Sequence, residues 1–224
     1  MLKLDNVNVF LGPVHVLRDI SLNLARNEVV YIIGRNGAGK TTVLKSIMGL
    51  VKVKTGNIIF KGKKITNLPP YVRARLGIGY APEDRRIFPH LTVEENIRLP
   101  TWTLKKSLNL NEIYTLFPRL KELRNRKGTY ISGGEQKMLA VARALSVSPS
   151  LLLLDEPFEG ISPSFVNKII ESIKKIIENI EVSILIADSK GVGMRELGNR
   201  AYVIDRGRIT YHGKVEEILN LGKF

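Results

Sequence analysis

Residues 28–42 read EVVYIIGRNGAGKTT, and this stretch decides the fold. Its first part is almost entirely apolar, which is typical of a strand buried on both faces of a sheet. Its second part fits the pattern G-x-x-x-x-G-K-[ST] and is followed by a helical pattern over 41–48. Glycines let the backbone curl so that successive N–H groups point at one anion, and the helix start adds a partial positive charge. The stretch therefore predicts a strand, a loop and a helix that together bind phosphate.

The residues of this loop define the predicted nucleotide site. We expect Lys40 to reach the β- and γ-phosphates of a nucleotide and the Thr41 hydroxyl to hold Mg²⁺. The residues predicted to contact the nucleotide are Gly34, Arg35, Asn36, Gly37, Ala38, Gly39, Lys40, Thr41 and Thr42.

Residues 151–157, LLLLDEP, supply acidic groups downstream of the loop. The four leucines predict a short buried strand, and ligands bind at the C-terminal ends of strands in open α/β sheets. At this end we expect Asp155 to hold Mg²⁺ through a water molecule. Glu156, one residue further, is expected to polarise the water that attacks the γ-phosphate.

A second helix start with the features of an anion site lies at residues 129–145, TYISGGEQKMLAVARAL. Two glycines follow Ser132, and an amphipathic helix follows them. Ser132 and Glu135 also fit a capping box, in which each side chain binds the backbone N–H of the other residue. The two roles are compatible. One nucleotide carries one triphosphate, so a second phosphate-seeking helix start in a single chain requires an explanation.

The remaining pattern predicts an α/β fold. Apolar strands alternate with helices, which favours a parallel sheet, and the N-terminal part adds antiparallel strands. The stretch 87–128 carries no strand signal, so we expect an inserted α-helical subdomain over about 87–149 that carries the second helix start. Segments 1–86 and 150–224 then form the core of a single domain, 1–224.

Composition limits the classes of protein that fit. The N-terminus, MLKLDNVNVF, is not a signal peptide, and no apolar run approaches the ~18 residues of a membrane span. The 224 residues carry a net charge of +14 and no cysteine. This charge suits nucleic acid, an anionic membrane face or a polyanionic ligand. The lysines are scattered along the chain, however, which favours a merely solvated surface.

The motifs GRNGAGKTT, ISGGEQ and LLLLDEP, in this order, resemble those of the nucleotide-binding subunits of ABC transporters over nearly the whole chain. The resemblance implies a P-loop NTPase core, ATP and Mg²⁺ as ligands, and Mg-dependent ATP hydrolysis. It also accounts for the second helix start, which in that family binds the γ-phosphate of an ATP held by a second subunit. Two chains placed head to tail would then bury two ATP molecules. The residues implied are Ser132, Gly133, Gly134 and Gln136.

Within the family, residues 77–97, GIGYAPEDRRIFPHLTVEENI, look like the ATPase subunits of branched-chain amino acid importers. Most members carry Gln where this chain has Glu83, which keeps an acceptor for Mg²⁺ or water. Residues 159–164, EGISPS, are similar to urea and amide importer subunits, so the solute class stays open. The resemblance implies integral membrane permease subunits as partners, with Ile87 and Phe88 either as apolar contacts to them or as part of the core of the helical subdomain. It also implies a second ATPase chain, identical or different, an indirect solute-binding protein, and a peripheral place on the cytoplasmic face of the membrane.

The sequence departs from the family at three positions. Leu11 aligns with the aromatic residue that stacks on adenine, while its neighbour Phe10 is expected in the core. Ser162 aligns with a family aspartate that couples the subunits. Ser189 aligns with the switch histidine and is expected to reach phosphate only through water. Hydrolysis is still expected, and the implied catalytic set is Glu156, Lys40, Glu83 and Ser189.

The main alternative is a soluble ABC ATPase that acts on nucleic acid or the ribosome. Such relatives usually carry a long coiled coil or two fused ATPase domains. This chain has one P-loop and no heptad run between residues 42 and 132. We therefore expect no nucleic-acid partner. An exporter ATPase is also disfavoured, because exporters often fuse this domain to membrane spans.

Overall fold

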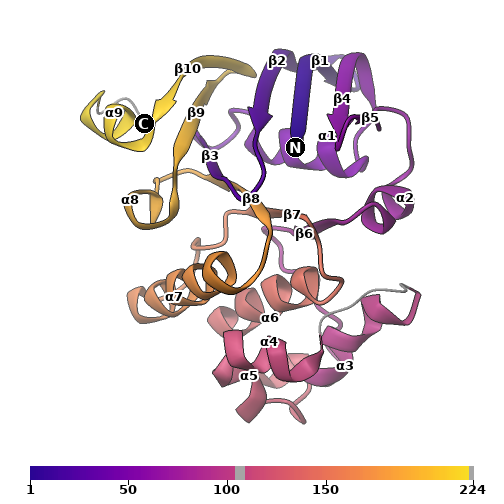
Figure 1. Ribbon diagram of the computed structural model, residues 1–224, viewed down its shortest axis with the longest axis vertical. Helices are drawn as coiled ribbons and strands as arrows, with labels where there is room; N and C mark the ends of the chain where they lie inside the picture. Colours follow the sequence, from indigo (N-terminus) through magenta and orange to yellow (C-terminus); the bar gives the residue numbers. More distant parts are fainter. Residues whose placement is uncertain (104–108, 222–224) are drawn as a thin grey trace.

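The computed structural model describes residues 1–103 and 109–221 as two β-sheets with helices between and beside them (Figure 1). The strands are β1 Leu2–Leu11, β2 Val14–Leu24, β3 Val29–Ile33, β4 Val53–Phe60, β5 Lys63–Lys64, β6 Ile78–Ala81, β7 Leu151–Asp155, β8 Ser183–Asp188, β9 Arg200–Asp205 and β10 Arg208–Lys214. The α-helices are α1 Lys40–Met48, α2 Pro70–Arg75, α3 Val93–Arg98, α4 Leu110–Leu116, α5 Pro118–Glu122, α6 Gly133–Leu145, α7 Pro163–Asn179, α8 Met194–Leu197 and α9 Val215–Leu221.

The six-stranded sheet has the order β10-β9-β3-β8-β7-β6 and is parallel except for β10. Its central strands are buried on both faces, as the apolar residues at the start of the stretch 28–42 predict. Val29 and Tyr31 belong to the core on one face, whereas Val30 and Ile32 belong to the core on the other. This alternation follows from the two-residue period of side chains along a strand.

Register brings the carboxyl ends of β3, β8 and β7 to one edge of this sheet. Ile33 pairs with Asp188, and Asp155 pairs with Ala187. The residues that follow these strands are Gly34, Ser189 and Glu156. Three segments that are far apart in the sequence therefore meet at the edge where parallel sheets place their ligand sites.

The four-stranded sheet has the order β2-β1-β4-β5 and is antiparallel. A polar turn at Arg26 and Asn27 follows β2, but it does not make a hairpin. The strands on its two sides, β2 and β3, belong to different sheets. Helix α1 lies between these sheets, with Val43, Leu44 and Ile47 buried in the same core as both.

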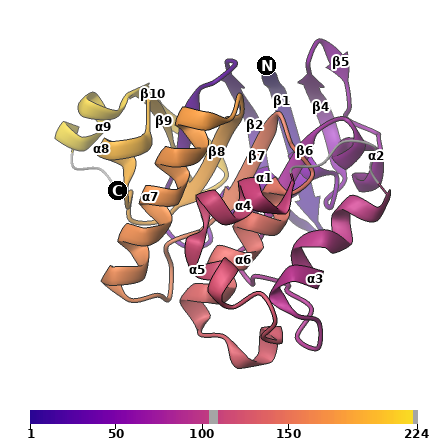
Figure 2. The ribbon, with the colours of Figure 1, turned by 60° about the horizontal axis from the view of Figure 1, so that its bottom comes forward.

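Helices α3 to α7 cover the other face of the parallel sheet (Figure 2). Between residues 87 and 149 the described backbone contains no strand element, only one isolated bridge between Thr92 and Lys127. Helix α3 is followed by a short 3₁₀ segment, Leu99–Thr103. Residues 104–108 of the predicted helical subdomain lie outside the described residues. Its helices share one continuous apolar core with the sheet, so the subdomain limits stay a prediction.

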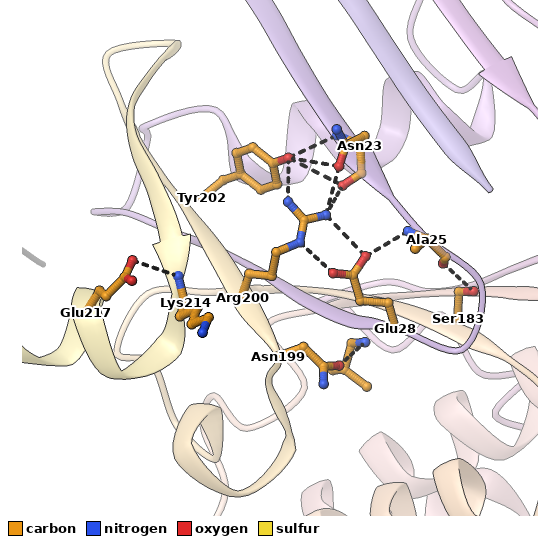
Figure 3. Close-up of polar contacts among 10 residues, drawn as sticks. Asn23, Ala25, Glu28, Ser183, Asn199, Arg200, Tyr202, Lys214 and Glu217 are labelled. Carbon is orange, nitrogen blue, oxygen red and sulfur yellow. Dashed lines mark hydrogen bonds and ion pairs between the residues drawn. The ribbon is translucent and has the colours of Figure 1, made fainter.

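A polar network closes the opposite edge of the sheet, where β3 and β9 begin (Figure 3). Arg200 donates to both carboxylate oxygens of Glu28 and to the backbone oxygen and side chain of Asn23. Glu28 also accepts from the N–H of Ala25 at 2.7 Å. The network ties the turn between the two sheets to β9.

Within the described part of the chain, no helix combines the length and the apolar character that crossing a membrane requires.

Candidate functional site

The loop between β3 and α1 has the tight backbone that its glycines predict. Gly39 immediately precedes α1 and has φ of 113°, in a region that other residues rarely adopt. Gly34 packs so closely that an added Cβ would lie 2.2 Å from the carbonyl oxygen of Ile204. The loop therefore needs glycine both for its turn and for its approach to β9.

Lys40 points back over this loop and is buried. Its Nζ donates to the carbonyl oxygens of Gly34 at 2.8 Å and Arg35 at 3.2 Å. The same atom lies 3.0 Å from Oε1 of Glu156, and both side chains are almost fully buried. A buried lysine requires such partners, because an ammonium without them is costly to remove from water.

Asp155 ends β7 beside the first turn of α1. Its Oδ1 accepts from the Thr41 hydroxyl at 2.9 Å, and its Oδ2 accepts from the Tyr80 hydroxyl at 2.9 Å. Burial raises the pKa of Asp155 above its ordinary value, although these two hydrogen bonds oppose the shift. Tyr80 comes from the neighbouring strand β6, and the sequence analysis had not singled it out for this site.

Glu156 follows directly and is held from two sides. Lys40 pairs with one carboxylate oxygen, and the N–H of Ser189 donates to the other at 3.0 Å. The Ser189 hydroxyl lies 3.3 Å from that second oxygen. Ser189, predicted to reach phosphate through water, therefore contacts the predicted base.

A cavity of about 470 Å³ lies over the loop. Lys40, Thr41 and Glu156 line it together with Glu83, which arrives from the loop after β6. The cavity is polar and has room for the phosphates of a nucleotide. Its other lining residues are Val16, Asn36, Gly37, Gly39, Thr42 and Glu159.

The oxygen atoms at this cavity suit Mg²⁺. The Thr41 hydroxyl and the Asp155 carboxylate lie within hydrogen-bonding distance of each other, and Glu83 adds a further carboxylate. Mg²⁺ prefers oxygen ligands and usually takes only one or two from carboxylates, the rest from water and substrate phosphates. Across the described residues, no group of three or more His, Cys, Asp or Glu side chains could hold an ion alone. A cation here would therefore depend on the nucleotide as well.

The second helix start is capped as predicted. The Ser132 hydroxyl accepts from the N–H of Glu135 at 3.3 Å, and Glu135 accepts from the N–H of Ser132 at 2.8 Å. Arg119 of α5 then pairs with the same carboxylate at 2.8 Å. Ser132 itself is exposed. Neither Ser132 nor Gly133 nor Gly134 is among the described residues that line the cavity over the first loop.

Two of the predicted contact residues of this helix start have neighbours within the chain. A Cβ on Gly134 would lie 2.6 Å from the ring of Phe165, so packing against α7 already requires glycine there. The Gln136 amide accepts from Arg85 at 2.9 Å and donates to the carbonyl of Gly128 at 3.1 Å. In this structure the Gln136 amide makes these two hydrogen bonds within the chain. A contact between Gln136 and phosphate stays a prediction.

One expectation for the aromatic residues is wrong. Phe10, expected in the core, is 42% exposed and stacks on His15 with ring centroids 4.1 Å apart. Leu11 beside it is 48% exposed. The register of β1 turns Val9 inward and leaves Phe10 on the surface, because alternate residues of a strand face opposite sides.

The chain is similar to known proteins in its sequence and in its fold. A sequence model of the ABC transporter family matches residues 17–159. The chain is 35% identical over its full length to the probable branched-chain amino acid transport ATP-binding protein LivF of Archaeoglobus fulgidus, and covers 96% of it. It is 36% identical to the lipopolysaccharide export system ATP-binding protein LptB of Haemophilus influenzae, with 92% of this chain and 87% of that protein covered. A dimeric ATP-binding cassette solved in a post-hydrolysis state with ADP and phosphate superposes with a TM-score of 0.85 at 25% identity, covering 96% of this chain and 99% of that chain.

Proposed function

The chain belongs to the ABC transporter family, and from that premise we propose that it powers the import of branched-chain amino acids or related small polar solutes. It is an ATPase of the cassette type, in which two cassettes act together with membrane permease subunits. The observation that carries the proposed role of the site is the placement of Glu156. Its carboxylate lies at the cavity over the loop, held by Lys40 and by Ser189.

We assign the following roles to the residues of this site. The loop residues 34–42 bind the phosphates of ATP through backbone N–H groups, and Lys40 binds the β- and γ-phosphates. Glu156 orients and polarises the water that attacks the γ-phosphate in line. Thr41, Asp155 and Glu83 would hold Mg²⁺, which when bound neutralises charge on the phosphate oxygens. Stabilising that charge in the transition state is the largest contribution that such a site makes.

The helix start at Ser132 completes the site of a second subunit. Ser132 is exposed, and its hydroxyl accepts only a long 3.3 Å bond from its own helix, so it is available to a ligand outside the chain. We propose that Ser132, Gly133 and Gly134 bind the γ-phosphate of the partner chain's ATP. On this reading residues 87–149 are a subdomain that brings this helix start to the partner.

The solute is proposed from similarity alone. The relative from Archaeoglobus fulgidus is named for branched-chain amino acid transport and matches from end to end. The relative from Haemophilus influenzae is named for lipopolysaccharide export, so export of a lipid is the second candidate. We place the chain on the cytoplasmic face of the membrane with permease subunits near Ile87 and Phe88; Phe88 is 46% exposed.

The first experiment tests the chemistry. Purified wild-type chain is expected to release phosphate from ATP with Mg²⁺. Glu156→Gln should lower kcat about a hundredfold or more while nucleotide affinity persists, because general-base catalysis contributes factors of this size. Lys40→Ala should abolish tight binding of a fluorescent ATP analogue. Normal turnover in Glu156→Gln would remove Glu156 from the role of base.

The second experiment tests the direction and the solute. The chain is purified together with its membrane subunits and reconstituted into vesicles with the solute-binding protein. ATP-dependent movement of labelled leucine toward the ATPase-free side of the membrane, or no movement at all, would contradict import. ATP-dependent extraction of a lipid from the bilayer would favour the export candidate.

A further inference from the structure

Lys137 of α6 is a buried cation with a specific partner in the catalytic region. Its side chain is almost completely buried, and its Nζ donates to the backbone carbonyl oxygen of Glu156 at 2.6 Å. Lysine is one of the residues least often buried in proteins. The amphipathic pattern around Lys137 predicts only a helix with one face toward the core and gives no sign of this contact.

The partner of Lys137 is an unusual residue. Glu156 has φ of 45°, in the left-handed region that side-chain-bearing residues rarely adopt. Its N–H donates to the carbonyl of Ala187 at 2.8 Å, and its carbonyl accepts from the N–H of Glu159 at 3.2 Å as well as from Lys137. The Lys137 bond is thus the shortest of the contacts that fix this peptide.

The charges near Lys137 explain how its ammonium is tolerated. Burial lowers the pKa of Lys137, and the charge of Arg85 lowers it further. The carboxylates of Glu83, Glu159 and Asp155 act in the opposite direction. A lysine that served packing alone would have no need of a charged end at this depth.

We propose that Lys137 is a positioning residue that fixes the backbone of Glu156 and so keeps its carboxylate between Lys40 and Ser189. This inference rests on the proposed function, in which Glu156 orients the attacking water. Lys137 lies five residues after Ser132, on the helix whose start is proposed to contact the partner chain's ATP. A shift of α6 on the partner's nucleotide therefore moves the group that holds this chain's own Glu156.

Three variants test the role of Lys137. Lys137→Met keeps the length and volume of the side chain but removes the donor, and Lys137→Arg keeps both charge and donors. Lys174→Met is the matched control, because Lys174 is an exposed lysine on the neighbouring helix α7. Lys137→Met should lower kcat about tenfold to a hundredfold, the scale expected for a misplaced catalytic group. KM and the affinity for a fluorescent ATP analogue should stay within about twofold, and Lys137→Arg should recover part of the loss.

A double-variant cycle separates positioning from general damage. If Lys137 acts through Glu156, Lys137→Met should cost little further turnover in the Glu156→Gln background, measured in single-turnover experiments with labelled ATP. The proposal is overturned if Lys137→Met turns over like Lys174→Met. It is also overturned if the loss in kcat is as large in the Glu156→Gln background, or if nucleotide affinity falls by the same factor. A wild-type chain that does not hydrolyse ATP would count against the proposed function instead.

Discussion

At the scale of single residues, Asp155 shows how the site depends on unremarkable side chains. Its two oxygens are engaged by Thr41, from the loop helix, and by Tyr80, from strand β6. Thr41 belongs to the loop motif, but Tyr80 lies in an ordinary apolar strand. A hydroxyl that binds a buried carboxylate holds it in one orientation, and this orientation limits the directions from which the carboxylate can bind a cation.

Tyr80→Phe removes this hydroxyl and leaves the ring in place. We expect the Mg²⁺ concentration that supports half-maximal ATP hydrolysis to rise about 10–100-fold, because outer partners of a ligand contribute on this scale. The titration of turnover with Mg²⁺, at saturating ATP, measures the change. Tyr71→Phe is the control, since Tyr71 is 63% exposed on α2. Equal Mg²⁺ dependence in both variants would show that the Tyr80 bond has no role in ion binding.

At the scale of elements, the helix α6 combines a local signal with a tertiary one. The capping box of Ser132 and Glu135 acts over three residues and needs no other part of the chain. The glycines between them differ in their surroundings. Gly134 is buried against the Phe165 ring of α7, whereas Gly133 lies beside the guanidinium at the end of the Arg85 side chain.

This difference predicts unequal effects of one added methyl group. Gly134→Ala places its Cβ 2.6 Å from the Phe165 ring and should lower the free energy of unfolding by about 1–3 kcal/mol, the usual cost of overpacking. Gly133→Ala meets only the end of the Arg85 side chain, at 3.2 Å, and a shift of that side chain by a few tenths of an ångström relieves the contact. Its unfolding free energy should stay within about 0.5 kcal/mol of wild type, as for most surface changes. Urea denaturation compares the two variants, and equal losses would refute the role of Phe165.

Arg73 shows the same dependence on tertiary contacts between helices α1 and α2. Its guanidinium is 2% exposed and donates to the carbonyls of Ser46, Ile47, Thr66 and Leu68. It thereby binds carbonyl groups in the last turn of α1, where the regular donors of a helix run out. The short pattern around Arg73 predicts a helix but gives no sign of this bond set.

At the scale of the whole molecule, Arg200 of β9 joins the two sheets at the edge opposite the site, because it donates both to Asn23 of β2 and to Glu28 before β3 (Figure 3). Burial alone would raise the pKa of Glu28, but the hydrogen bonds from Arg200 and Ala25 outweigh it. The pKa of Glu28 in the folded chain therefore lies below its ordinary value of 4.5. A carboxyl group of this kind stabilises the fold above its ordinary pKa and loses that contribution as pH falls through the folded pKa.

The comparison of wild type with Glu28→Gln tests this sign. At pH 7 the wild-type chain should be more stable, because only the charged carboxylate pairs with Arg200. As pH falls below 4.5 the difference between the two melting temperatures should shrink. Thermal unfolding followed by circular dichroism, at pH 7 and at acid pH, measures this difference in melting temperature. A difference that grows toward acid pH would contradict the direction of the shift.

The assembly of two chains is the other property of the whole molecule. Glu156→Gln should form a dimer with Mg-ATP and remain monomeric with Mg-ADP, because only ATP offers a γ-phosphate to Ser132 of the partner. Light scattering of the purified variant gives the mass in each condition. A Ser132→Arg, Glu156→Gln double variant serves as the control and should stay monomeric with either nucleotide. Dimerisation of that control would place the contact elsewhere.

Patterns along the chain suffice to predict the parts of this protein whose structure depends on near neighbours in the sequence. The phosphate loop, the strand buried on both faces and the capped helix at Ser132 all follow from spacing within a few residues. Their physical causes are local: the freedom of glycine, the two-residue period of a strand, and the orphan N–H groups of a helix start.

Which of these parts meet depends on the packing of the whole chain. The order of β6, β7, β8 and β3 in one parallel sheet brings Tyr80 and Thr41 onto Asp155, and Ser189 onto Glu156. The packing of α6 on that sheet then carries Lys137 to the backbone of Glu156. These pairs are separated by 19 to 114 residues, and no periodicity along the chain encodes such a distance. Strand order and helix packing encode it, because they are set by burial over the whole molecule rather than by any single stretch.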